Sequence, residues 1–114
     1  MYAVEVNVTP LHDPSERTVW RLLENRRAAE KLWYQLDALA GREKTVEDGG
    51  VSCHVVGARV WEVRVQDRAA AIAAVEAGNA RVLKYTENVI FEISEEILEW
   101  IEEPLLRLPP DDAA

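Results

Sequence analysis

The spacing of apolar residues changes twice along this chain, and these changes limit the folds that it can adopt. Residues 2–8 alternate, with Tyr2, Val4, Val6 and Val8 on one side of the chain and Ala3, Glu5 and Asn7 on the other. This period of two is typical of a half-buried strand. From residue 14 to residue 40 the apolar positions follow a helical spacing, and after Arg42 the period returns to two. A chain of this kind predicts an α+β domain.

Capping residues set the expected ends of the first helix. Asp13 precedes Pro14, and Glu16 follows at the position that closes a capping box. Gly41 is a typical helix stop. The sequence therefore predicts one long helix over residues 14–40.

The second half of the chain reads as short strands around a small helix. Asp48-Gly49-Gly50 is a strong turn signal, and Asp67 is an N-cap. The expected strands are 44–47, 51–56, 59–65, 80–85 and 89–93, with helices over 68–77 and from Ser94 to Pro104. This order predicts a ferredoxin-like β-α-β-β-α-β plait, with an antiparallel sheet, one long helix and an added C-terminal helix. We expect a single domain over residues 1–108 and an acidic tail over residues 109–114.

The negative charge is concentrated near the C-terminus. The net charge is −8, and residues 87–114 hold nine acids against the single base Arg107. Residues 1–86 hold twelve acids and twelve bases. An acidic segment repels phosphate backbones and attracts basic surfaces, so nucleic acid is not the expected partner. A helix face that is merely solvated explains the same charges.

The residue types that carry catalysis or bind metals are scarce. The chain has one cysteine, Cys53, and two histidines, His12 and His54. Cys53 and His54 are neighbours in a strand and point to opposite faces, so they cannot share a metal or form a thiolate–imidazole pair. Phosphate-binding loops and nucleophile elbows are absent. We expect no catalytic residue, no metal and no cofactor.

No hydrophobic run approaches the length of a membrane span, and the N-terminus lacks the features of a signal peptide. We therefore expect a cytoplasmic protein, or one incorporated into an assembly built in the cytoplasm.

Three stretches resemble the central strands of RelE/HigB-type toxins, which are ribonucleases. They are Val60-Trp-Glu-Val-Arg-Val, Ala80-Arg-Val-Leu-Lys-Tyr and Val89-Ile-Phe-Glu-Ile. The resemblance covers about a third of the chain and implies a component of a toxin–antitoxin system. The sequence departs from that pattern in three ways. A helix-like stretch, 68–77, separates the first two strands, and Glu95, Glu96 and Glu99 follow the last strand where such toxins place bases that hold mRNA. The chain is also acidic where an enzyme that cuts mRNA should be basic. The resemblance therefore implies a relative without ribonuclease activity.

Two groups of residues are candidates for binding a partner. On the predicted first helix, an outer stripe combines aromatic, apolar and basic side chains: Trp20, Leu23, Arg27, Lys31 and Tyr34. On the predicted last helix, a tryptophan lies among acids: Glu95, Glu96, Glu99, Trp100 and Glu103. Aromatic residues beside arginine are typical of interface anchors. Alternatively, residues 105–108 fold back and cover the first stripe.

These features predict a non-enzymatic protein-interaction or assembly subunit. Its expected partner is another protein or a second copy of itself, as in a multi-protein machine or a viral particle. The alternatives are the inactive toxin–antitoxin component and, from fold analogy alone, a small-ligand regulatory domain.

Overall fold

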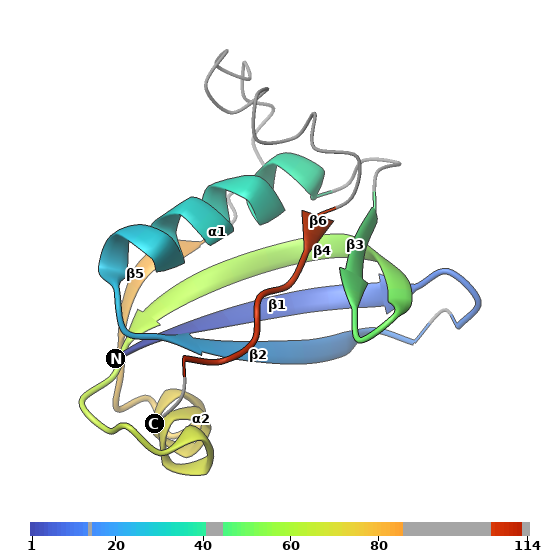
Figure 1. Ribbon diagram of the computed structural model, residues 1–114. Coiled ribbons are helices and arrows are strands. Elements are labelled where there is room, and N and C mark those ends of the chain that lie inside the picture. The colour runs from blue at the N-terminus through green and yellow to red at the C-terminus, as the bar shows by residue number, and fades with distance from the viewer. Residues whose placement is uncertain (14, 41–44, 86–105, 113–114) are drawn as a thin grey trace.

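The computed structural model describes residues 1–13, 15–40, 45–85 and 106–112. They form a small α+β domain with a radius of gyration of 13.6 Å (Figure 1). In chain order the elements are β1 (Tyr2–Pro10), β2 (Arg17–Leu23), α1 (Arg26–Leu39), β3 (Thr45–Asp48), β4 (Val51–Glu62), α2 (Arg68–Glu76), β5 (Arg81–Tyr85) and β6 (Leu106–Arg107).

The described strands belong to one curled sheet in the order β2-β1-β4-β3-β6, with β5 also paired to β4. β6 runs parallel to β3, and the other pairs are antiparallel. β4 pairs with β1 along one edge. Along its other edge it pairs with β3 at residues 51–54 and with β5 at residues 59–62. The long strand β4 therefore joins all parts of the sheet.

Helix α1 covers one face of the sheet, and its apolar side forms the main core. Ala29, Leu32, Trp33, Leu36 and Leu39 are its buried residues, and they pack against valines of the central strands. The N-cap is Asn25, whose side-chain oxygen accepts a hydrogen bond from the Ala28 amide at 3.1 Å.

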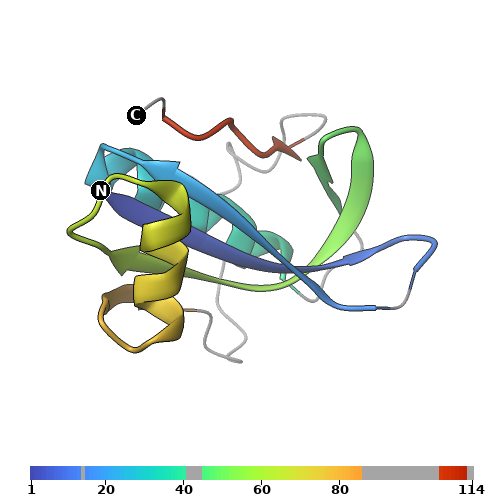
Figure 2. The ribbon, with the colours of Figure 1, turned by 90° about the horizontal axis from the view of Figure 1, so that it is seen from below.

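The opposite face of the sheet is covered only at one end by α2, as Figure 2 shows for the described residues. Ala71 and Val75 of α2 are buried in a second core cluster with Ala3, Trp20 and Val63. The two helices thus lie on opposite sides of the sheet, and each side has its own core.

Several sequence predictions are confirmed. β1 follows the expected alternation, with Val4, Val6 and Val8 buried. Gly49 and Gly50 form the two-residue turn between β3 and β4, with φ of 56° and 85°. The helix capped by Asp67 and the strand over residues 81–85 are also present. The predicted strand 89–93 and the last helix lie outside the described residues.

The prediction of one long helix over residues 14–40 is wrong in its first half. Residues 17–23 form β2, which pairs with β1 in a hairpin, and the helix begins only after Asn25. Asp13 is not a helix cap: its carboxylate accepts a hydrogen bond from the Ser15 amide at 3.0 Å and pairs with Arg17. These bonds, the Ser15 amide first, lower the pKa of Asp13.

The predicted pair of strands 51–56 and 59–65 is one continuous strand, β4. The register with β1 shifts between Asn7 and Val8, opposite Gly57, so the irregularity at this glycine is a bulge and not a break. The ferredoxin-like plait is not confirmed, because β2 enters the order between β1 and α1.

Candidate interaction surface

The five residues of the predicted helical stripe do not share one helix. Trp20 and Leu23 belong to β2 and are 8% and 5% exposed. They point to opposite faces of the sheet, since Trp20 packs in the cluster under α2 and Leu23 in the core under α1. Their side chains are thus packed inside the monomer. Only Arg27, Lys31 and Tyr34 lie on α1, where Arg27 and Lys31 are exposed and Tyr34 is half-buried.

Tyr34 belongs to a compact group of aromatic and basic side chains between α1 and β5. The rings of Trp33 and Tyr34 meet edge to face at a centroid distance of 4.9 Å. Lys84 Nζ lies 5.3 Å from the Tyr34 ring centroid and donates a hydrogen bond to the Tyr34 hydroxyl at 3.3 Å. This cation–π contact ties β5 to α1. Tyr34 therefore supports the fold, whatever else it contacts.

The acidic candidates Glu95, Glu96, Glu99, Trp100 and Glu103 lie outside the described residues. Their role as a partner-binding group stays a prediction.

The structure brings together a different set of residues, on the sheet face opposite α1. Direct pairing places Trp20, Glu5, Arg59 and Tyr85 in one row across the four strands β2, β1, β4 and β5. Glu5 lies in the middle of this row. Its carboxylate accepts a hydrogen bond from Trp61 Nε1 at 3.3 Å and lies 3.7 Å from the Arg59 guanidinium. The row thus passes from a buried indole under α2 to an exposed tyrosine.

Polar side chains continue on the side of this row away from α2. Asn7 and Thr18 are paired across β1 and β2, and their side chains hydrogen-bond at 3.0 Å. Thr9 pairs with His54, which points away from the core because its neighbours Cys53 and Val55 point into it. We call this surface the polar sheet face: Glu5, Asn7, Thr9, Thr18, His54, Arg59 and Tyr85.

Arg59 and Tyr85 are both exposed on the polar sheet face. The Arg59 side chain is 52% exposed, and Tyr85 is 52% exposed. Val82, which follows the same face at the α2 end, is 41% exposed. In Figure 2 no described segment other than α2 lies over this side of the sheet. The face can therefore offer an aromatic ring, a guanidinium and several hydrogen-bonding side chains to a ligand.

The described residues show no group of three histidine, cysteine or acidic side chains that could hold a metal ion. Cys53 is buried, and this burial raises the pKa of its thiol. His12 is exposed in the loop after β1. No described helix is long and apolar enough to cross a membrane.

The sequence carries a partial signal for the polar sheet face. Glu5 and Asn7 form the polar half of the alternating segment, and such residues line whichever face is not in the core. Arg59 and Tyr85 could not be added to them, because pairing between distant strands decides which residues join a row.

Neither the family models, nor the curated proteins, nor the solved structures include a match to this chain. The resemblance to RelE/HigB-type toxins therefore stays a prediction. Two of its three stretches include the ends of β4 and β5 that pair with each other, and residues 89–93 lie outside the described part of the chain.

Proposed function

We propose that the protein is a non-enzymatic interaction subunit, which binds another protein through the polar sheet face. The observation that carries this proposal is the row from Glu5 through Arg59 to Tyr85, which ends in a half-exposed aromatic ring and a half-exposed guanidinium. Tyrosine and arginine are enriched at the centres of protein interfaces and supply much of their binding energy.

The origin of the surface in a hydrogen-bonded sheet also favours a macromolecular partner. The residues come from four strands of a hydrogen-bonded sheet, so their backbone positions are held before binding and little ordering is lost when a partner docks. The paired Glu5 leaves Arg59 partly neutralised. A partner that meets this face with an acidic or carbonyl group would engage Arg59, and an apolar or proline side chain would pack on Tyr85.

The predicted acidic group around Trp100 enters the proposal as a second contact. Charged groups near an interface raise the association rate more than the residence time. We therefore assign the residence time to the polar sheet face and the salt sensitivity of association to the acidic residues.

The test is native mass spectrometry of the protein purified from its own host, as the wild type and as an Arg59→Gln/Tyr85→Ser double variant. We expect one protein to accompany the wild type stoichiometrically and its occupancy to fall by about tenfold or more in the double variant, since losing one hot spot costs about 2 kcal/mol. The monomer's stability should change by only about 0.5 kcal/mol for each exposed position.

The matched control is Leu11→Ser, which removes an equally exposed apolar side chain from the loop after β1. A partner that stays bound to the double variant, or that is lost equally from the Leu11→Ser protein, contradicts the assignment of the face. The absence of any partner on the wild type contradicts the function itself.

A further inference from the structure

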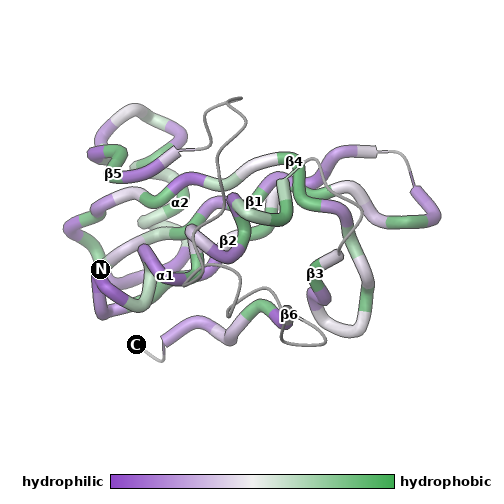
Figure 3. The backbone as a smooth tube through the Cα atoms, turned by 90° about the horizontal axis from the view of Figure 1, so that it is seen from above, coloured by the Kyte–Doolittle hydropathy of each residue, from purple (hydrophilic) through white to green (hydrophobic). Residues whose placement is uncertain are grey.

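The C-terminal segment, residues 106–112, runs from β3 at one edge of the sheet to the outer edge of β2 at the other (Figures 1 and 2). It begins as β6, which pairs with Val46 and Glu47 of β3. The Leu108 amide then donates to the Glu47 carbonyl at 3.0 Å, and the Leu108 side chain is 9% exposed in the main core. Figure 3 shows the segment changing from hydrophobic near β6 to hydrophilic toward the C-terminus. Leu108, near the apolar end of the segment, is thus buried in the main core, and the acidic end lies at the outer edge of β2.

The acidic end satisfies the outward-facing backbone groups of β2. The Asp112 amide donates to the Leu22 carbonyl at 2.8 Å. The Leu22 amide donates to the Asp111 carboxylate at 3.0 Å, and the Glu24 amide donates to the Asp112 carboxylate at 2.6 Å. An exposed strand edge readily pairs with another extended chain. Here two carboxylates and a single amide occupy that edge in place of a regular ladder.

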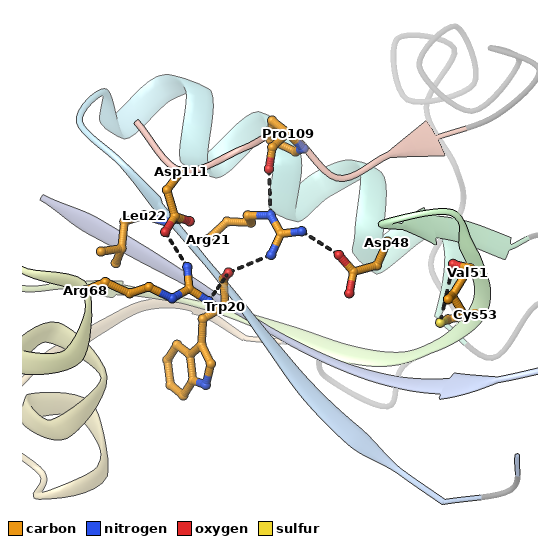
Figure 4. Close-up of polar contacts among 9 residues, drawn as sticks. All are labelled: Trp20, Arg21, Leu22, Asp48, Val51, Cys53, Arg68, Pro109 and Asp111. Atoms are coloured by element: carbon orange, nitrogen blue, oxygen red, sulfur yellow. Dashed lines mark hydrogen bonds and ion pairs between the residues drawn. The ribbon is translucent and has the colours of Figure 1, made fainter. Parts of the chain in front are cut away.

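Two arginines bind the segment, as Figure 4 shows. Arg21 Nε donates to the Pro109 carbonyl at 2.6 Å, and the same guanidinium bonds to Asp48 at 2.5 Å. Arg68 of α2 forms an ion pair with Asp111 and also donates to the Trp20 carbonyl at 3.1 Å. The site that binds the segment therefore consists of the part of the main core that buries Leu108, the outer edge of β2, and the guanidinium groups of Arg21 and Arg68.

The C-terminal segment resembles a bound peptide more than an integral strand. Pro109 and Pro110 have no amide hydrogen, so the ladder between β6 and β3 cannot continue through them. After β6, the Leu108 and Asp112 amides donate singly, to Glu47 and Leu22. The hairpin of β1 and β2 and the β1–β4 pairing do not pass through it. Release of the segment therefore opens the β2 edge without breaking the central ladders.

We propose that this site also accepts the C-terminal segment of a second copy, so that two chains exchange their segments reciprocally. Every contact described above joins the segment to residues at least 43 positions away in sequence, and each can form equally between two copies. Exchange of an identical element closes a two-fold dimer without any new contact.

The chain length allows this exchange. Twenty residues, 86–105, separate the end of β5 from the start of β6. A fully extended chain of that many residues spans at most about 66 Å, at about 3.3 Å per residue, which is greater than the longest dimension of the domain. That dimension is 34 Å, so the site of a touching neighbour lies within reach. Exchange is favoured at high protein concentration or when another interface holds two copies together.

The experiment uses two charge-reversed variants, Arg68→Glu and Asp111→Arg. The two proteins are mixed, unfolded and refolded together at about 100 µM, a concentration at which association between chains competes with folding. Within either copy the ion pair becomes a repulsion. In an exchanged heterodimer both pairs are restored, because each site meets a segment of opposite charge. We expect native mass spectrometry to show about tenfold more dimer in the mixture than in either copy alone, which corresponds to about 1.4 kcal/mol.

The matched control applies the same reversals to Arg26 and Glu30, an ion pair within α1 that exchange of the C-terminal segment cannot restore. A mixture of Arg26→Glu and Glu30→Arg copies should show no gain in dimer. A gain in this control, or no gain in the test mixture, overturns the proposal. Dimers that form equally in each copy alone assign self-association to another surface, such as the polar sheet face, and also overturn it.

A second measurement does not depend on charge reversal. Glu24→Cys and Asp112→Cys copies, each in a Cys53→Ala background, place one cysteine on each side of the contact between Glu24 and Asp112, and both residues are exposed. Exchange predicts a disulfide between the two kinds of copy. The proposal is wrong if the double-cysteine chain forms its internal disulfide while the mixed copies form none.

Discussion

Replacement of Trp20 by alanine tests the largest difference between the predicted helix and the observed strand. Trp20 is 8% exposed and packs against Ala3, Leu22, Val63 and α2. A buried aromatic side chain removes about 150–250 Å² from water, worth roughly 4–6 kcal/mol as an upper bound. Measured losses for Trp→Ala are about 3–5 kcal/mol, and α2 can relax toward the vacated space. We therefore expect a loss of about 3 kcal/mol.

Urea unfolding of the Trp20→Ala protein, followed by circular dichroism, measures this loss. With a slope of about 1.5 kcal/mol/M, the midpoint should fall by about 2 M. The thermal midpoint should fall by roughly 12 °C, at roughly 4 °C for each kcal/mol in a domain of this size. The control is Tyr85→Ala, an exposed aromatic on the same sheet face, which should cost no more than about 0.5 kcal/mol. If Trp20→Ala loses less than about 1 kcal/mol, Trp20 is a surface residue and β2 is wrongly assigned.

Two further predictions concern the start of α1 and the C-terminal segment. Asn25→Ala should lower the free energy of unfolding by about 1 kcal/mol, because it removes the observed N-cap. Asp13→Ala, at the wrongly predicted cap, should lower it clearly less. Equal decreases for the two variants in urea unfolding would contradict the helix start. For Asp111, burial raises the carboxyl pKa, but the hydrogen bonds from Arg68 and Leu22 outweigh it and hold the pKa below 3.8. The charged form therefore stabilises the fold above pH 3.8, and this stabilisation is lost as the pH falls through the lower folded-state pKa. The wild type should therefore have a higher free energy of unfolding than Asp111→Asn near pH 6. This difference should shrink on acidification below about pH 4, the ordinary range of an aspartate. A difference that stays constant with pH would refute the ion pair's role.

The sequence alone determined the elements whose signals are local and mutually consistent. Residues 4–8 alternate between valine and a polar residue, and a strand is the one regular structure with that period. Gly49 and Gly50 both adopt positive φ, which glycine reaches without strain. These two adjacent glycines therefore predict the turn from the sequence alone. Asp67 likewise marked the start of α2.

The candidate site could be predicted only in part, because its residues are joined by pairing between strands. Glu5 was recognised as the polar side of an alternating strand. Arg59 and Tyr85 became its neighbours through two separate registers, β1 with β4 and β4 with β5. A register shift of one residue would move either side chain to the other face, and no local pattern specifies that register.

Only the tertiary structure decided the state of residues 17–23. Val19, Trp20, Leu22 and Leu23 satisfy a helical spacing and also place apolar side chains on both faces of a strand. Helix propensity differs by less than about 1 kcal/mol per residue among such side chains, so it is readily overridden. The strand is the more stable state because residues Tyr2 to Val8 of β1 pair with β2 along a free edge. In addition, α2 buries Trp20 and the main core buries Leu23. Each of these partners lies elsewhere in the chain, and the free energy that selects the strand exists only once they have come together.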